Sequence, residues 1–239
     1  MSPSGSRAPA RVVSLVPSVT ETLLAWAVVP VACTRFCEQP QLRHVGGTKD
    51  PDVAAIVDLR PDLVVMCDEE NRREDADALV AAGLVVHSCS PRSVGDVDGA
   101  LAELAGAVGA PGPPPGAAAS AVAGIVPLGL RAFVPIWRRP WMTLAADTYG
   151  SSVLAALGVA NAFAAAPERY PEVDLDAARA AGADVVLAPS EPYPFRDRHV
   201  AELATVAPVV LVDGQDLFWW GARTPAALRR LHATISATR

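Results

Sequence analysis

Lysine is almost absent from this chain, because Lys49 is the only one and arginine supplies the other basic side chains. Acidic residues outnumber basic ones, giving a formal net charge of -6, and the arginines form no basic stripe along the sequence. Nucleic acids are bound mainly through clustered positive charge. The composition therefore excludes nucleic acid as the expected partner.

Long apolar runs are also missing, although 51% of the residues are hydrophobic. No window offers the roughly 20 uninterrupted apolar residues that a membrane-spanning helix needs. Residues 1–10 lack the apolar core and cleavage site of a secretory signal, and we expect them to be disordered. The sequence as written predicts a cytoplasmic protein without membrane insertion, whereas a start site further upstream would predict an extracytoplasmic one.

Cysteines are few and catalytic motifs are missing. Cys33, Cys37, Cys67 and Cys89 are expected to be reduced thiols in a cytoplasmic protein, and no Cys-x-x-Cys or His-x-x-x-His spacing occurs. No nucleophile elbow, Walker loop or Gly-x-Gly-x-x-Gly turn follows an expected strand. The sequence therefore predicts a protein that is not an enzyme.

Short apolar segments alternate with helical patterns along the chain. The expected strands are 11–15, 29–33, 63–67, 84–87, 132–136, 185–188 and 209–212. The expected helices are 20–27, 52–59, 74–82, 93–108, 117–126, 151–157, 174–181, 199–204 and 224–238. Strands of four or five apolar residues between helices indicate a parallel sheet covered on both faces.

A segment rich in proline and glycine, 109–116, interrupts this alternation and indicates a boundary. We predict an α/β fold with two Rossmann-like lobes of parallel-rich sheets, 11–108 and 128–239. A linker and a single interlobe helix would occupy 109–127. Ligands of such sheets bind beyond the carboxyl ends of the strands, so a ligand cleft is expected between the lobes.

Aromatic and charged residues follow several of the expected strands, and four of the five tryptophans are among them. The candidates for ligand contact are Phe36, Cys37, Cys67, Glu69, Glu70, Trp137, Arg138, Trp141, Tyr193, Phe195, Trp219, Trp220 and Arg223. Because large aromatic side chains are usually packed, several of them in loops indicate a wall for a flat ligand.

Each of these features also has an ordinary structural interpretation. A loop tryptophan can cover the core, and the acidic run 68–70 can begin a solvated helix. Cys37 and Cys67 can be buried structural thiols or metal ligands, and His87 fits a core or loop position. Which of these interpretations applies depends on the tertiary structure.

Three stretches resemble the class III substrate-binding proteins, the helical-backbone metal receptors of ABC importers. They are Arg-Val-Val-Ser-Leu-Val-Pro-Ser-Val-Thr-Glu-Thr-Leu at 11–23, Val-Gly-Gly-Thr-Lys-Asp-Pro at 45–51, and Leu-Arg-Pro-Asp-Leu-Val-Val at 59–65. The resemblance runs from about residue 11 to the C-terminus and is nearest to the cobalamin-binding branch. It implies a two-lobed receptor for cobalamin, haem, a siderophore or another metal chelate, with no cofactor required.

The resemblance also implies roles for individual residues. Phe36, Tyr170 and the pair Trp219-Trp220 match ligand-contacting aromatics of the cobalamin-binding branch, and Trp141 is a looser match. Thr48 and Cys67 stand where that branch has tryptophans.

Docking to an ABC permease is expected to be weakened. Importer-dedicated members of the family carry an acidic residue on each lobe, and here Ala54 takes the first position while Asp176 keeps the second. We therefore expect a carrier or sensor of a metal chelate. The alternative is an enzyme on the same frame, a chelatase or thiol-dependent lyase that uses Cys37, Cys67 and Glu70.

Overall fold

The computed structural model describes residues 11–237, so the disorder predicted for 1–10 lies outside the described part. The chain divides into two compact units. The first comprises the described residues up to Pro91 together with Asp98–Pro115, and the second comprises Arg92–Val97 and the described residues from Gly116 onward. The predicted bounds of the lobes, 11–108 and 128–239, and of the linker between them, 109–127, stay a prediction.

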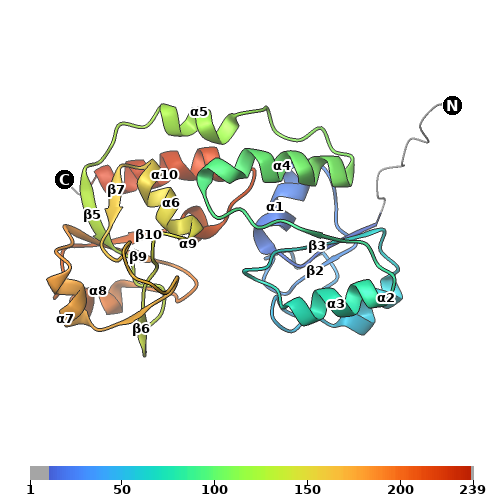
Figure 1. The fold of residues 1–239 in the computed structure, drawn as a ribbon, viewed down its shortest axis with the longest axis horizontal. Coiled ribbons are helices and arrows are strands. Elements are labelled where there is room, and N and C mark those ends of the chain that lie inside the picture. The colour runs from blue at the N-terminus through green and yellow to red at the C-terminus, as the bar shows by residue number, and fades with distance from the viewer. Residues whose placement is uncertain (1–10, 238–239) are drawn as a thin grey trace. The chain divides into compact units, whose positions relative to one another are not determined.

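The first unit is built on a four-stranded parallel sheet with the order β2-β1-β3-β4. Its strands are β1 (Val12–Ser14), β2 (Ala32–Cys33), β3 (Leu63–Met66) and β4 (Val86–Ser88). Its helices are α1 (Pro17–Ala25), α2 (Val53–Leu59), α3 (Arg73–Ala81) and most of α4 (Val94–Val108). Figure 1 shows α2 and α3 on one side of this sheet and α1 on the other. Ile56 of α2 and Leu79 of α3 pack with Val13 and Val64 of the sheet in one apolar cluster.

The second unit repeats this plan with a parallel sheet of order β10-β9-β5-β7 and an antiparallel ribbon of β6 and β8. Its strands are β5 (Leu130–Phe133), β6 (Trp141–Met142), β7 (Val159–Asn161), β8 (Glu172–Val173), β9 (Val185–Pro189) and β10 (Val209–Val212). Its helices are α5 (Ala117–Ala123), α6 (Tyr149–Ala156), α7 (Leu175–Ala180), α8 (Asp197–Leu203), α9 (Gly214–Phe218) and α10 (Thr224–Ser236). In Figure 1, α7 and α8 lie on one side of the sheet and α6 and α10 on the other.

Each unit has, at the amino ends of its strands, the same pair of hydrogen bonds from one arginine. In the first, the backbone N–H of Arg11 donates to the Asp62 carboxylate at 2.9 Å, and its guanidinium donates to the Leu59 carbonyl. In the second, Arg131 makes the same two bonds, to Asp184 at 2.7 Å and to the Ala181 carbonyl. These contacts tie the polar turn before each central strand to the neighbouring strand.

Helix starts also follow a shared rule. Asp52 caps α2 by accepting from the Ala55 N–H at 2.9 Å, and Asp174 caps α7 by accepting from the Ala177 N–H at 2.6 Å. A carboxylate at this position satisfies an amide that has no partner inside the helix. The sequence therefore contains its own start signals for corresponding helices in both units.

The α/β class and the two parallel-rich lobes are confirmed, and several element bounds are corrected. The expected strand 29–33 shortens to β2, because Pro30 has no N–H to give to a ladder. The helix expected at 117–126 ends at Ala123, since Gly124 and the position before Pro127 disfavour helix, and α5 packs on α10 within the second unit. Four short elements, β6, β7, β8 and α9, were not predicted.

Among residues 11–237, no helix is long and apolar enough to cross a bilayer.

Candidate functional site

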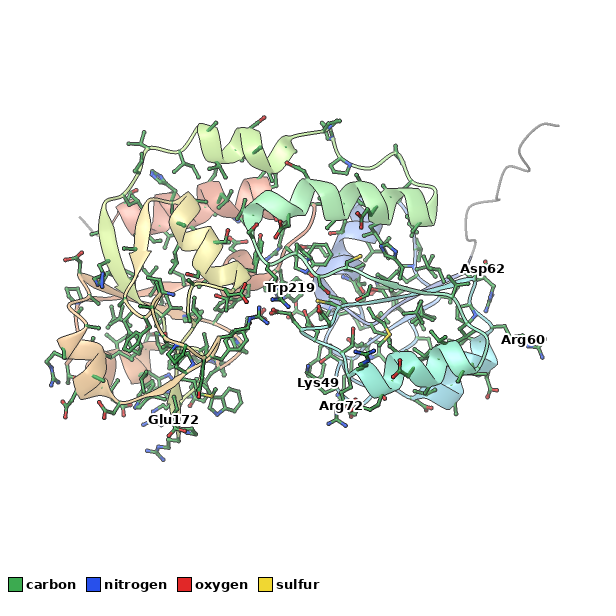
Figure 2. All side chains as sticks on the ribbon, in the orientation of Figure 1. Lys49, Arg60, Asp62, Arg72, Glu172 and Trp219 are labelled. Atoms are coloured by element: carbon green, nitrogen blue, oxygen red, sulfur yellow. The ribbon has the colours of Figure 1, made fainter. Side chains whose placement is uncertain are left out.

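In the first unit, an exposed aromatic ring lies in the turn that follows β2. The Phe36 side chain is 50% exposed, and the Arg35 guanidinium lies 4.8 Å from its ring centroid. Arg35 Nη2 donates to both carboxylate oxygens of Asp50, at 3.0 Å each, which holds the guanidinium near the ring. Figure 2 shows Lys49 and Arg72 on the side of the first unit where its parallel strands end, and Arg60 and Asp62 on the opposite side.

In the second unit, the segment after β5 forms a tight turn that exposes Trp137. This indole is 44% exposed and meets the Tyr193 ring edge-on, with 5.6 Å between the centroids. Trp141, predicted to be in a loop, lies in β6 and stacks on Phe195 at 6.0 Å. The Arg138 guanidinium lies 5.8 Å from the Trp141 ring, so a cation again accompanies the aromatic surface.

Two further pairs of the same kind occur in the second unit. In the segment between β7 and β8, Arg169 lies 5.6 Å from the ring of Tyr170, which is 39% exposed. After β10 and α9, Arg223 lies 5.2 Å from the ring of the half-buried Trp219. Figure 2 labels Trp219 where the chain leaves α9. Each pair thus lies in the connection after a parallel strand of its own unit, namely β2, β5, β7 or β10, and Trp141 lies in the short antiparallel strand β6 within such a connection. Ligands of such folds bind at this end of the strands.

Each of these arginines also contacts a carboxylate. Arg138 pairs with Glu202 at 2.9 Å and Arg169 with Asp147 at 3.4 Å. These pairs are partly exposed, so each contributes little to stability, and a ligand anion could share or replace the carboxylate at small cost. Asp216 differs because it is buried and holds both Arg223 and Arg230, at 3.3 and 2.6 Å. That pairing fixes the guanidinium over Trp219.

Four of the predicted contact residues are buried. Phe195 and Trp220 are 3% and 5% exposed, and Phe195 packs into the core with Phe133. Cys37 and Cys67 are each 3% exposed. Phe195 contacts the rings of Trp141 and Tyr193. Direct ligand contact by the four buried side chains stays a prediction.

The two candidate glutamates lie in the turn after β3, which is organised by Asn71. The carbonyl of Glu69 accepts from Lys49 Nζ at 2.8 Å, and the N–H of Glu70 donates to the Cys67 carbonyl. Asn71 is buried, accepts from the Cys67 N–H at 2.8 Å, and donates to the carbonyls of Leu15 and Thr48 at 3.1 and 2.9 Å. One side chain thus joins the segments that follow β1, β2 and β3.

The four cysteines are buried and free, and their surroundings lower the pKa of one thiol and raise the pKa of the other three. A hydrogen bond from Cys33, together with bonds from the Thr20 and Thr34 hydroxyls, lowers the pKa of Cys37 to about 6 despite its burial. The same bond raises the pKa of Cys33. Burial raises the pKa of Cys67 to about 11 and that of Cys89 to about 12, and the charge of Cys67 contributes to the latter.

Bare metal has no evident site in the described part of the chain. Among residues 11–237, no group of three or more His, Cys, Asp or Glu side chains could hold a metal ion. Cys37 and Cys67 also belong to different hydrogen-bond networks, one with Thr34 and the other with Ser90. The set of Cys37, Cys67 and Glu70 suggested by the enzyme alternative is therefore not assembled as a metal site.

Sequence reasoning missed Arg35, Arg169 and Asn71. A signal for the arginines was present, since Arg35-Phe36, Trp137-Arg138 and Arg169-Tyr170 each place an arginine beside an aromatic residue. Asn71 left no such signal. Its partners are 56, 23 and 4 residues away along the chain, so only the folded sheet brings them together.

The fold is that of the periplasmic solute-binding proteins. No protein-family model matches the chain, and no curated relative matches its sequence. Solved structures match over nearly the full length. The periplasmic vitamin B12 binding protein BtuF of Vibrio cholerae has a TM-score of 0.74 and 18% identity, covering 96% of this chain and 97% of that one.

Two haem-binding structures are similarly close. The periplasmic haem-binding protein RhuT from a Roseiflexus species, in its apo form, has a TM-score of 0.77 and 20% identity, covering 95% of this chain and 98% of that one. A periplasmic haem-binding protein from Pseudomonas aeruginosa has a TM-score of 0.75 and 21% identity, covering 94% and 92%. At these identities the likeness establishes a common fold.

Proposed function

We propose that this protein is a receptor for a metal chelate with a flat face, such as haem, cobalamin or a related tetrapyrrole. One observation carries the proposal: four aromatic rings, each accompanied by a guanidinium, lie in the connections that come after parallel strands of the units. Aromatic faces stack on a macrocycle, and planar guanidinium groups bind carboxylates or phosphates at its rim. The known ligands of the structurally similar proteins, vitamin B12 and haem, support this choice.

Non-catalytic binding is the role that the described residues support best. The similar structures are described as binding proteins. The cysteines and the glutamate of the enzyme alternative do not form a metal centre in the described part of the chain. The protein's own contribution would be to orient the chelate by stacking and to neutralise its anionic groups.

The proposal is tested by titrating the purified protein with hemin and with cyanocobalamin while following tryptophan fluorescence and visible absorbance. We expect saturable quenching with at least one of them. Trp137→Ala and Phe36→Ala should each weaken binding by about 1 to 3 kcal/mol, the range for an aromatic anchor.

Trp26→Ala is the matched control, because Trp26 caps the carboxyl end of α1, away from the segments that follow the strands. It should leave the affinity unchanged. Absence of saturable binding of either chelate, or an equal loss in Trp26→Ala, would count against the proposed function.

Docking to an ABC permease is a finer proposal. Asp176 is exposed on α7 and pairs with Arg179 at 2.7 Å, whereas Ala54, exposed on α2, offers no charge. We propose that any docking relies on the second unit and is weaker than in dedicated importers. The similar proteins are periplasmic, so extracytoplasmic capture stands beside the cytoplasmic carrier or sensor expected from the sequence, and fractionation of host cells distinguishes the two.

A further inference from the structure

One turn of the second unit holds two adjacent arginines between two tryptophans. The connection after β5 reverses between Trp137 and Met142, whose backbones form an antiparallel bridge, and the Met142 N–H donates to the Trp137 carbonyl at 3.2 Å. Residues 138–140 form the tip of this turn. The tip therefore lies, along the chain, between the exposed ring of Trp137 and the ring of Trp141.

The two arginines of the tip differ in their partners. Arg138 pairs with Glu202 at 2.9 Å, so its charge is compensated within the protein. Arg139 is exposed, and among residues 11–237 its side chain makes no hydrogen bond, ion pair or ring contact. Glu172, which is labelled in Figure 2 and lies opposite Met142 in the β6–β8 ribbon, makes no ion pair with it either. The tip thus carries a positive charge that no carboxylate of the described residues compensates.

Arg139 also adopts a backbone conformation that arginine disfavours. Its φ is 69°, in the left-handed region, where glycine is the residue with the least steric cost. A glycine would form the turn with less strain, so the turn alone does not account for an arginine at this position. Strained residues of this kind are concentrated at binding sites and active sites. The backbone is therefore a second observation, independent of charge, that indicates a role for the Arg139 side chain.

We propose that Arg139 is a specificity-determining residue that selects chelates with ionised carboxylates at their rim. The inference rests on the proposed function and narrows its ligand class to an anionic macrocycle, such as a porphyrin with propionate groups. Trp137 supplies the stacking area, and the guanidinium at the tip donates to a carboxylate at the edge of the same ligand. An esterified chelate of the same shape still stacks, but it offers no charge to Arg139.

The two contributions are separable, because stacking depends on ring area and the attraction depends on charge. An exposed ion pair is weak by itself and is screened by salt. Arg139 should therefore change the selectivity between charged and uncharged chelates, and this change should be largest at low ionic strength.

The test compares hemin with its dimethyl ester, in the same mild detergent and at low salt, by quenching of tryptophan fluorescence. We expect the wild-type protein to bind hemin more tightly than the ester. Arg139→Gln should weaken hemin binding about fivefold, as for loss of an exposed ion pair, and should leave ester binding within about twofold of wild type. Added salt should weaken hemin binding to the wild type more than to the variant.

Two further variants control for the turn and for the loss of an arginine. Arg139→Gly removes the charge and suits the positive φ, so it should lose the selectivity for hemin while keeping the turn. Arg60→Gln is the matched control, because Arg60 is also exposed and has a φ of 47°. It ends α2, on the side of the first unit opposite to the ends of its strands (Figure 2), and its loss should leave both affinities unchanged.

Three results would overturn this role of Arg139: equal binding of hemin and ester by the wild type, equal losses for both chelates in Arg139→Gln, or an unchanged hemin affinity in that variant. Each of them leaves the proposed function standing, because chelate binding is still observed. Saturable binding of cyanocobalamin with none of hemin would also overturn the role of Arg139 alone. Failure of the wild type to bind any of the three chelates would overturn the proposed function and the role of Arg139 together.

Discussion

At the scale of single residues, arginine is suited to this surface in a way that lysine is not. Its planar guanidinium can lie over a ring and still offer in-plane donors to a carboxylate, whereas an ammonium group is a compact point charge. Arg35 makes both contacts at once, with its guanidinium 4.8 Å from the Phe36 ring centroid and its Nη2 donating to Asp50.

Two adjacent tryptophans should separate binding from stability. Trp220 is 5% exposed and Trp219 is half-buried under Arg223. We expect Trp220→Ala to lower the free energy of unfolding by about 3 to 5 kcal/mol, because it leaves a cavity. Trp219→Ala should cost about 1 kcal/mol and should weaken chelate binding instead. Urea unfolding and hemin titration of both variants measure this, and equal stability losses would contradict the assignment.

His199 should make stability fall at acid pH. Burial, together with Arg198, Arg138 and Arg196, lowers the pKa of His199, while Glu202 opposes the shift. The ring also packs against Tyr193, and its Nδ1 accepts from the Arg196 N–H at 3.1 Å, a bond that protonation of Nδ1 breaks.

The sign follows from the lowered pKa. Below the unfolded-state value of about 6.5, the unfolded chain binds the proton more readily than the folded one, so stability declines as pH falls toward the folded-state pKa. His199→Gln should flatten this part of the stability curve, measured by urea unfolding between mildly acidic and neutral pH. If the free energy of unfolding of the variant falls with decreasing pH as steeply as that of the wild type, groups other than His199 cause the decline.

At the scale of elements, each unit fixes its strand ends by side chains from elsewhere in the chain. The hydrogen bonds from Arg11 and Arg131 act at the amino ends, before β3 and β9. At the carboxyl ends, Asn71 joins three segments of the first unit, and the Ser190 hydroxyl accepts from the Gly214 N–H in the second. The candidate ligand surface is therefore held by polar contacts rather than by the apolar core alone.

Removal of the Asn71 side chain should disturb all three segments together. Asn71→Ala leaves buried backbone groups of Cys67, Leu15 and Thr48 without this partner, and we expect a loss of about 2 to 4 kcal/mol. Gln41→Ala, an exposed side chain whose amide donates to Gln39, serves as the control and should cost at most about 0.5 kcal/mol. Equal unfolding midpoints for the two variants would show that Asn71 does not hold the three segments together.

At the scale of the whole molecule, a bound chelate should increase the free energy of unfolding, whereas removal of free metal should leave it unchanged. Binding to the folded state adds about 2.7 kcal/mol at a ligand concentration one hundred times Kd. We therefore expect hemin or cyanocobalamin to raise the melting temperature, and dialysis against EDTA to leave it unchanged. Stoichiometric zinc that survives dialysis and is lost in Cys37→Ser would contradict this and would favour the enzyme alternative.

The sequence by itself determined the α/β class, the parallel sheets and most helix positions. These follow from local patterns: four or five apolar residues for a buried strand, an Asp before a helix, a glycine or proline at its end. The turns before β3 and β9 are of this local kind, because a helix end, a polar turn and a strand lie within a few residues of one another in each.

Only the tertiary structure decided which of the candidate residues face solvent. Trp219 and Trp220 are neighbours in the chain, yet one is half-buried beneath an arginine and the other lies in the core, because burial depends on contacts with distant segments. The nearness of Cys89 to Cys67 and the three partners of Asn71 depend on strand order, which no local pattern encodes. The sequence thus determined the elements, and their packing determined the chemistry of the side chains between them.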